Sequence, residues 1–380
     1  MSHPTTNPVT APSAPTDRLP LIAGLTLAAV MVAGAWQMVA ALQHPDGLVF
    51  ARSWIDFRQG RSTGQLEKQL EHKLPARGAL IAAANGARYA VTGAAGEQVR
   101  GGSGGWLFLA EELRYDAAGP ANLAARASLL AGAAQTLKRQ GVYLLVAVVP
   151  DKARIYGEQL PGRAYPSYLQ TRYADTLAAM RARGVHVVDL LTPLTQGARG
   201  APVYYRSDTH WNQRGAQLAA GAIAQAAGTA QLRLAKTTFS SSAGQPATRV
   251  GDLIGLMGVA DLPAALRPPF DVEAPVTTRQ TSVDAPAGLF GDVEVPVVLT
   301  GTSYSLRGNF HGYLQQALSA KVLNTAKDGG GFLQAPEAYF KDEAFASAKP
   351  ALLVWEVPER MLLAPLDKEA GWLASVGLAR

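Results

Sequence analysis

Several short runs of this sequence are apolar without alternation, and this pattern constrains the fold more than any other feature. Strands buried on one face alternate apolar with polar residues, whereas strands buried on both faces read as continuous apolar runs. The longest such runs are GVYLLVAVVP (141–150), VHVVDL (185–190), VPVVLTGTS (295–303) and ALLVWEVP (351–358). They predict strands of a mostly parallel sheet with helices on both faces.

Helical patterns separate these runs, as a parallel sheet requires. The predicted helices cover 121–140, 168–184, 211–228 and 306–320, and KVLN (321–324) predicts one more short strand. The expected fold is therefore a three-layer α/β/α domain. Residues 228–290 are rich in Thr, Ser, Pro and Gly and do not follow this rhythm. We expect a long irregular excursion there, with a lid beside the active site as the alternative.

The N-terminus contains one long apolar run. Leu19 to Leu42 includes Gln37 as its only strongly polar residue. A helix of that length reaches about 36 Å at about 1.5 Å per residue, enough to cross a hydrocarbon core of about 30 Å. We expect a transmembrane anchor. The alternative is a cleaved signal peptide with a cleavage site at Ala33-Gly34-Ala35. The predicted organisation is a tail (1–18), the anchor (19–42), a helical juxtamembrane segment (43–100) and the main domain (101–380).

Composition excludes several classes of function. The chain has no cysteine, so disulfides, thiolate zinc sites and thiol catalysis are all ruled out. Its formal net charge is +6, from 35 Lys and Arg and 29 Asp and Glu residues, and no dense basic block occurs. A surface that follows a phosphate backbone needs clustered positive charge, so nucleic acid is not an expected partner.

Two short motifs carry the chemistry. Asp208-Thr209-His210-Trp211 places a carboxylate two residues from an imidazole, and Gly301-Thr302-Ser303 places a hydroxyl at the end of an apolar run. Acyl transfer by serine needs a nucleophile, a base and an acid that orients the base. Ser303 would lie at the carboxyl edge of the sheet, beside helix N–H groups that can hold an oxyanion. The alternative is that Ser303 or Ser305 only caps the following helix.

The Asp208–His210 pair lies in a loop, SDTHWN, between a predicted short strand (PVYY, 202–205) and a helix. There Asp208 can orient the ring and His210 can deprotonate the hydroxyl. A metal site is the alternative, but no second histidine falls at ligand spacing, so we expect no metal. His186 is expected in the core and His311 on a helix surface. His3, His44 and His72 lie outside the domain.

Five motifs in order resemble the AlgJ/AlgX family of polysaccharide O-acetyltransferases. They are GGWLFL (104–109), VVPDKARIY (148–156), SDTHWNQRGA (207–216), GDLIGLM (251–257) and LTGTSYS (299–305). These proteins are similar to SGNH hydrolases, with the motif order circularly permuted. The resemblance implies an SGNH-hydrolase-like fold for 101–380, with Ser303 as nucleophile, His210 as base and Asp208 as the orienting acid. SGNH enzymes usually carry Asp-x-x-His and GDS motifs, and this chain departs from both.

The resemblance also implies a setting. The expected enzyme is anchored in the inner membrane through 19–42, with its N-terminal tail in the cytoplasm and its catalytic domain in the periplasm. It would acetylate an exopolysaccharide such as alginate or cellulose, with acetyl groups supplied by a membrane-bound O-acyltransferase partner. No cofactor is expected. An esterase or deacetylase with the same triad, and a non-catalytic polymer-binding scaffold, remain as alternatives.

Further residues near the motifs are candidates for substrate or oxyanion contact: Tyr304, Arg307, Asn309 and Trp211. A position on a helix surface is the alternative for Arg307 and Asn309, and a position in the core is the alternative for Trp211. Lys152 and Arg154 follow a predicted strand. They can contact a polymer, or lie in a solvated loop.

Overall fold

The computed structural model describes residues 77–281 and 295–378, together with 28–29, 31–37, 39–40, 55 and 58. By internal contacts the chain forms two compact units, Met1–Ile81 and Ala82–Arg380. Residues 28–29, 31–37 and 39–40 of the predicted anchor are helical, and its remaining residues lie outside the described ones. Among the described residues, no helix combines the length and apolarity needed to cross a membrane.

The second unit is built on one parallel sheet, as predicted. Five strands lie in the order β10-β9-β11-β3-β4, and every neighbouring pair is parallel. All residues of β9 and β11 are buried. The strands span Val322–Asn324 (β10), Val297–Thr300 (β9), Leu352–Pro358 (β11), Tyr143–Val149 (β3) and Val187–Asp189 (β4).

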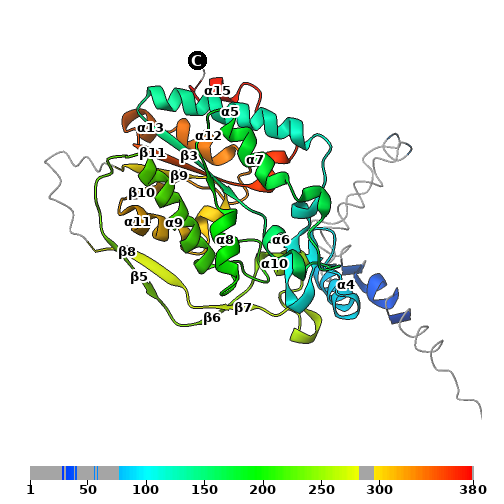
Figure 1. Cartoon of the computed structure of the whole chain (residues 1–380). Coiled ribbons are helices and arrows are strands. Elements are labelled where there is room, and N and C mark those ends of the chain that lie inside the picture. Colours follow the sequence, from blue (N-terminus) through cyan, green and yellow to red (C-terminus); the bar gives the residue numbers. More distant parts are fainter. Residues whose placement is uncertain are drawn as a thin grey trace, which may run out of the picture. The chain divides into compact units, whose positions relative to one another are not determined.

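Helices cover both faces of this sheet, which confirms the three-layer arrangement (Figure 1). Alternate residues of β3 belong to separate cores: Leu145 and Ala147 to one, Leu144 and Val146 to the other. The first core also contains residues of α9 (Gln213–Thr229), α11 (Phe310–Leu318) and α8 (Leu191–Ala198). The second contains residues of α5 (Gly119–Arg139), α7 (Arg172–Arg181), α12 (Gln334–Phe340), α13 (Glu343–Ser347), α14 (Glu359–Leu363) and α15 (Trp372–Ser375).

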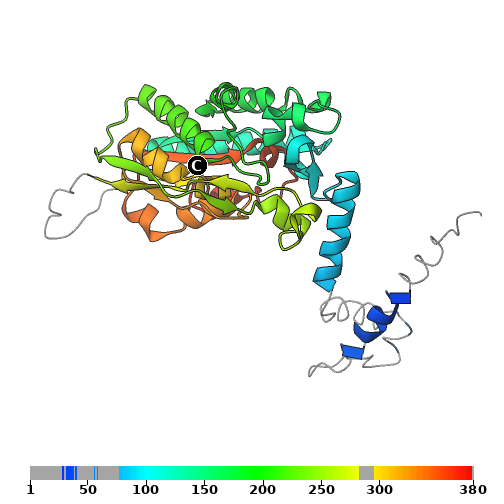
Figure 2. The same ribbon diagram turned by 90° about the horizontal axis from the view of Figure 1, so that it is seen from below.

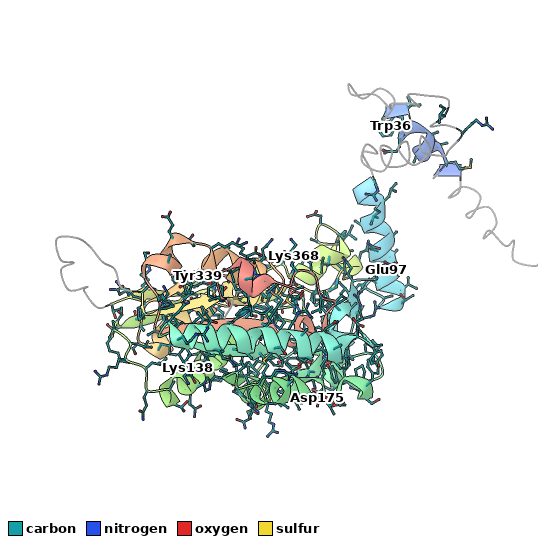
Figure 3. All side chains as sticks on the ribbon, turned by 90° about the horizontal axis from the view of Figure 1, so that it is seen from above. Trp36, Glu97, Lys138, Asp175, Tyr339 and Lys368 are labelled. Carbon is teal, nitrogen blue, oxygen red and sulfur yellow. The ribbon has the colours of Figure 1, made fainter. Side chains whose placement is uncertain are left out.

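The outer sides of these helices face solvent. Lys138 of α5 and Asp175 of α7 are exposed and lie on the surface away from the sheet (Figure 3). The apolar stripes of α5 and α7 therefore pack toward the strands, while Lys138 and Asp175 remain hydrated.

A small antiparallel pair precedes the main sheet. β1 (Val99–Gly101) pairs with β2 (Leu107–Leu109), and helix α4 (Arg77–Thr92) lies before it in the chain. A third apolar cluster joins Val99 and Leu107 to Leu253 of α10 (Asp252–Met257). This contact connects the start of the domain to the GDLIGLM motif.

Within the predicted excursion 228–290, the described residues 228–281 are more regular than predicted. β5 (Phe239–Ala243) pairs with β8 (Val276–Gln280), and β6 (Ala247–Arg249) pairs with β7 (Asp271–Glu273), both antiparallel. These ribbons run along the lower edge of the domain in Figure 1 and across its near side in Figure 2, where they are yellow-green. We call residues 239–280 the arm.

Candidate active site

A tight loop presents the acid and the base. The Tyr205 N–H donates to the His210 carbonyl at 3.3 Å, and the Asn212 N–H donates to the Val203 carbonyl at 3.0 Å. The predicted strand PVYY is therefore wrong, because the chain turns back on itself and forms only one isolated bridge, between Tyr204 and Trp211. We call residues 203–212 the base loop.

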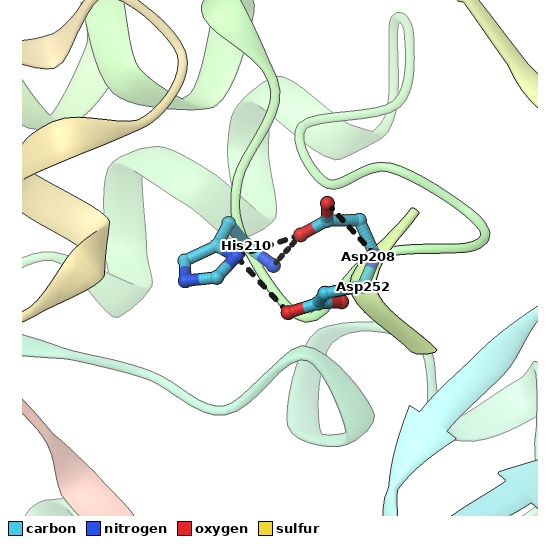
Figure 4. Close-up of side chains that lie close together, drawn as sticks. All are labelled: Asp208, His210 and Asp252. Carbon is cyan, nitrogen blue, oxygen red and sulfur yellow. Dashed lines mark hydrogen bonds and ion pairs between the residues drawn. The ribbon is translucent and has the colours of Figure 1, made fainter. Parts of the chain in front are cut away.

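The base loop and the end of β9 bring the three predicted groups together. His210 Nδ1 lies 2.7 Å from Asp208 Oδ1 (Figure 4), and His210 Nε2 lies 2.7 Å from Ser303 Oγ. With the ring proton on Nδ1, Nε2 is the atom that can accept the hydroxyl proton. Asp208 and His210 are buried, and Ser303 is partly exposed. The geometry is that of a nucleophile, a base and an orienting acid.

Asp208 is held in its ionised form. Its Oδ1 also accepts the His210 N–H at 2.9 Å, and its Oδ2 accepts Arg249 Nη2 at 2.8 Å. Burial raises the pKa of Asp208, but the hydrogen bond and charge of His210 and the charge of Arg249 outweigh it and hold this pKa well below its usual range. A carboxylate that stays charged can stabilise an imidazolium beside it.

The nucleophile follows β9 through a glycine in an unusual conformation. Gly301 has φ 155°, and a Cβ there would lie 2.6 Å from the Glu356 carbonyl oxygen. Ser303 then opens a short 3₁₀ turn, Ser303–Leu306, whose cap is Thr302: its hydroxyl accepts the Tyr304 N–H at 3.3 Å. Neither Ser303 nor Ser305 is the cap, so the capping alternative is wrong.

Glu356 of β11 holds this turn through hydrogen bonds. It accepts the Thr302 N–H at 2.8 Å, the Thr302 hydroxyl at 3.0 Å and the Ser305 hydroxyl at 3.0 Å. Glu356 is 0% exposed, and burial raises its pKa. Reasoning from the sequence missed this residue, although a lone acid inside the apolar run ALLVWEVP was a signal of a special role.

Lys152 holds the backbone of the base loop. Its Nζ donates to the Arg206 carbonyl at 2.9 Å and to the Asp208 carbonyl at 2.8 Å, above the rings of Trp106 and Phe108. It is 0% exposed, and burial lowers its pKa to about 8. Both predictions for Lys152, polymer contact and a solvated loop, are wrong, because its ammonium group is buried and bonds to carbonyls inside the domain.

Arg154 is also internal. Its guanidinium pairs with Glu359 of α14 at 2.8 Å, and only 7% of its side chain is exposed. Helix α6 (Lys152–Ile155) therefore ties β3 to both the base loop and α14. Polymer contact and a solvated loop are therefore also wrong for Arg154, because its guanidinium is paired inside the domain.

Trp211 and Tyr304 are buried behind the imidazole. Trp211 Nε1 donates to the Tyr304 carbonyl at 3.1 Å, and the Tyr304 hydroxyl donates to the Thr209 carbonyl at 3.0 Å. The Tyr304 and His210 ring centroids are 4.8 Å apart. The core position considered for Trp211 is confirmed by its burial, and the hydrogen bonds of both side chains join the base loop to residue 304 rather than to solvent.

Arg307 and Asn309 lie nearer the surface. Arg307 pairs with exposed Asp328 at 2.8 Å, and Asn309 precedes α11 and donates to the Thr278 hydroxyl of the arm at 2.8 Å. Their contact with substrate stays a prediction. His311 is half-buried on α11, and its Nε2 lies 2.7 Å from the Val322 carbonyl oxygen.

The core position predicted for His186 is wrong. β4 begins one residue later, at Val187, and the His186 ring is exposed and stacks on Tyr143. The apolar run predicted the strand, but only part of that run pairs with β3.

One group of potential metal ligands coincides with this site. Ligand atoms of Asp208, His210 and Asp252 lie within 4.8 Å of one another. Both oxygens of Asp208 already accept N–H donors, and its distance to His210 Nδ1 is that of a hydrogen bond. This donor set fits an orienting acid better than a metal ligand.

Comparisons with known proteins point to one family. The family model of the SGNH hydrolase-like domain of the acetyltransferase AlgX matches residues 99–359. A probable alginate O-acetylase AlgJ of Azotobacter vinelandii is 36% identical over 286 residues, which are 73% of this chain and 74% of the relative. The AlgJ of Pseudomonas aeruginosa, with the same description, is 37% identical over 290 residues, 72% of this chain and 74% of the relative.

Solved structures agree. The O-acetyltransferase domain of Pseudomonas putida AlgJ matches with a TM-score of 0.64 at 34% identity, over 73% of this chain and 98% of that one. The structure of Pseudomonas aeruginosa AlgX matches with a TM-score of 0.56 at 25% identity, over 80% of this chain and 71% of that one. The resemblance predicted from the five motifs is therefore confirmed.

Proposed function

The chain belongs to the family of SGNH hydrolase-like acetyltransferases that includes AlgX, and we propose that this O-acetyltransferase acetylates an exported polysaccharide through an acetyl-serine at Ser303. The observation that carries the proposal is the unbroken contact from Asp208 through His210 to the Ser303 hydroxyl, with 2.7 Å at both steps.

The first half-reaction forms the acetyl-enzyme. His210 Nε2 accepts the Ser303 hydroxyl proton while Oγ attacks the carbonyl carbon of the acetyl donor. The resulting oxyanion needs hydrogen-bond donors. The Ser303 N–H is suitable, because it has no hydrogen-bond acceptor in the described part of the chain. When the tetrahedral intermediate collapses, the proton on His210 goes to the leaving group of the donor.

The second half-reaction moves the acetyl group to the acceptor. A sugar hydroxyl gives its proton to His210 Nε2 while its oxygen attacks the acetyl carbonyl carbon. Collapse then breaks the bond to Ser303 Oγ, which recovers the proton from His210. Asp208 stabilises the imidazolium that appears in each half-reaction, so one base serves both.

The setting is part of the proposal. Relatives described as probable alginate O-acetylases make alginate the first acceptor to test, with cellulose second. An apolar segment at 19–42 supports an inner-membrane anchor with a periplasmic catalytic domain. Acetyl-CoA stays in the cytoplasm, so a membrane-bound O-acyltransferase is the partner that would deliver acetyl groups to this domain.

The test supplies a chromogenic acetyl ester with and without an oligosaccharide. We expect acetylated oligosaccharide by mass spectrometry, and a transient acetyl group on the protein. Ser303→Ala and His210→Ala should abolish both in a folded protein. Release of acetate without acetylated sugar would instead support the esterase, and the absence of any acetyl-enzyme would support the scaffold.

A further inference from the structure

A second carboxylate lies beside His210. Asp252, the first residue of α10, places Oδ2 3.4 Å from His210 Nδ1, the same ring nitrogen that contacts Asp208 (Figure 4). The two acids differ in environment, because the side chain of Asp208 is 3% exposed and that of Asp252 is 39% exposed. The ring therefore has a buried acid and a solvated acid on the same side.

Asp252 is fixed in this position by the base loop itself. Its Oδ1 accepts the Thr209 N–H at 2.7 Å, and its own N–H donates to Asp208 Oδ2 at 3.3 Å. Gly251 allows the approach: a Cβ there would lie 2.0 Å from the Ser207 carbonyl oxygen, a distance that no side chain can occupy. The first turn of α10 thus lies directly on the base loop.

We propose that Asp252 is a second positioning residue for the base: together with Asp208 it orients His210 and stabilises the protonated ring during both half-reactions. This inference rests on the acyl-transfer function proposed above. A negative charge near an imidazole favours its protonated form, and at 3.4 Å in a partly exposed site the attraction is not fully screened. No bond to Asp252 forms or breaks.

Other charged and titratable groups lie near the ring. Arg249 offsets the negative charge of Asp208, and Lys152 lies behind the base loop. Glu356 lies beside residues 302–306, which we call the nucleophile turn, and the neutral Tyr304 ring packs against the imidazole. Arg249 bonds to the Asp208 carboxylate, and Lys152 bonds to the Asp208 backbone carbonyl. Glu356 bonds to the nucleophile turn. Asp252 is therefore the further anion beside Nδ1.

Opposing effects act on the pKa of Asp252. Burial and then the charge of Asp208 raise its pKa, whereas the charge of His210 and the Thr209 N–H lower it. The net effect is a raised pKa. Protonation of His210 therefore draws Asp252 toward its charged form, so the second carboxylate acts most strongly when the imidazolium exists.

The test is Asp252→Asn in the full chain, with kcat/KM for a chromogenic acetyl ester measured against pH. A neutral amide removes the charge and keeps the shape. The acid limb of the profile should move to lower pH by about half a unit, because the ring loses a stabilising anion and gives up its proton sooner. The plateau should fall about three- to tenfold because the base is weaker and less well oriented.

Asp271→Asn is the matched control. Asp271 holds the same loop through the Arg206 N–H at 3.1 Å and the Ser207 N–H at 2.9 Å, and neither bond involves His210. If loosening of the loop were the only effect of Asp252→Asn, both variants would lower the rate and neither would shift the acid limb. An unshifted acid limb in folded Asp252→Asn overturns the proposal, as does an equal shift in Asp271→Asn.

Removal of the Asp208 carboxylate gives an independent test. Asp208→Asn should retain activity that Asp208→Asn/Asp252→Asn loses by a further factor of about ten, because Asp252 is the remaining partner of Nδ1. An equal rate for the single and double variants contradicts the role. Failure of the proposed function is distinguishable, since the wild-type protein would then form no Ser303-dependent acetyl-enzyme at all.

Discussion

At the residue scale, the site depends on ionisable groups that are buried and hydrogen-bonded. Glu356 lies under the nucleophile and Lys152 behind the base loop, and each bonds to uncharged donors or acceptors of the backbone and of hydroxyls. A buried ion held in this way costs free energy when its partners are removed. Both residues therefore couple the geometry of the triad to the stability of the domain.

Glu356→Ala should leave the Thr302 N–H and the hydroxyls of Thr302 and Ser305 without their acceptor. We expect a loss of about 2–4 kcal/mol in the free energy of unfolding and at least a tenfold loss in kcat, because the nucleophile turn is no longer fixed. Denaturant unfolding and esterase kinetics measure the two. Glu337→Gln, at a partly exposed ion pair with Lys341, is the control and should change stability by less than about 0.5 kcal/mol.

Lys152 should give the stability of the domain a pH dependence. Its pKa is about 8 in the folded protein against 10.5 as the reference, so the unfolded chain binds more protons between these values. The free energy of unfolding should therefore rise with pH across this window, by at most about 1.4 kcal/mol per unit from this group. Below pH 8 both states are protonated and the effect is constant.

Lys152→Met removes this dependence. Denaturant unfolding at several pH values should show that the difference in unfolding free energy between wild type and Lys152→Met changes from pH 8 to pH 10.5. Lys138→Met, at an exposed position on α5, should leave the slope as in wild type. A parallel pH dependence in wild type and Lys152→Met would contradict the assignment.

At the element scale, α10 and the base loop act as one unit because a glycine lets them touch. Gly251→Ala should force them apart, since the new Cβ would lie 2.0 Å from the Ser207 carbonyl. We expect a stability loss of about 2 kcal/mol or more and a reduced kcat, measured by unfolding and by acetyl-ester turnover.

The same helix supplies the control. A Cβ at Gly255 would meet no atom within 4 Å, and this glycine lies inside α10. Gly255→Ala should leave kcat unchanged and raise stability by up to about 1 kcal/mol, because alanine favours a helix. A kcat loss equal to that of Gly251→Ala would show that the close approach is not what matters.

Elements in the sheet could be predicted, whereas elements of the arm could not. Strands β3 and β11 are buried on both faces, so their sequences are unbroken apolar runs. The β5 and β8 sequences, FSSSA and VTTRQ, pair mainly with each other and remain largely exposed, so their composition is that of a loop. That Asp208, His210 and Ser303 lie together could be predicted because these residue types are chemically specific. Asp252 and Lys152 could not, because their roles depend on contacts between distant segments.

At the scale of the whole molecule, the predicted anchor can be tested directly. If residues 19–42 span the inner membrane, the full chain should stay with membranes after carbonate extraction, and a chain that begins after residue 42 should not. Protease added to spheroplasts should digest the domain if it faces the periplasm, with a cytoplasmic protein as the control. Full release of the intact chain by carbonate would contradict the anchor.

The arm follows the base loop in the chain and precedes the strand that carries the nucleophile, and it delivers Arg249 and Asp252 to the acid and the base. It therefore adjusts the proton affinity of the site without contributing an atom to the bonds that change. A substitution in this segment would therefore change the reactivity of the site while Asp208, His210 and Ser303 stay the same.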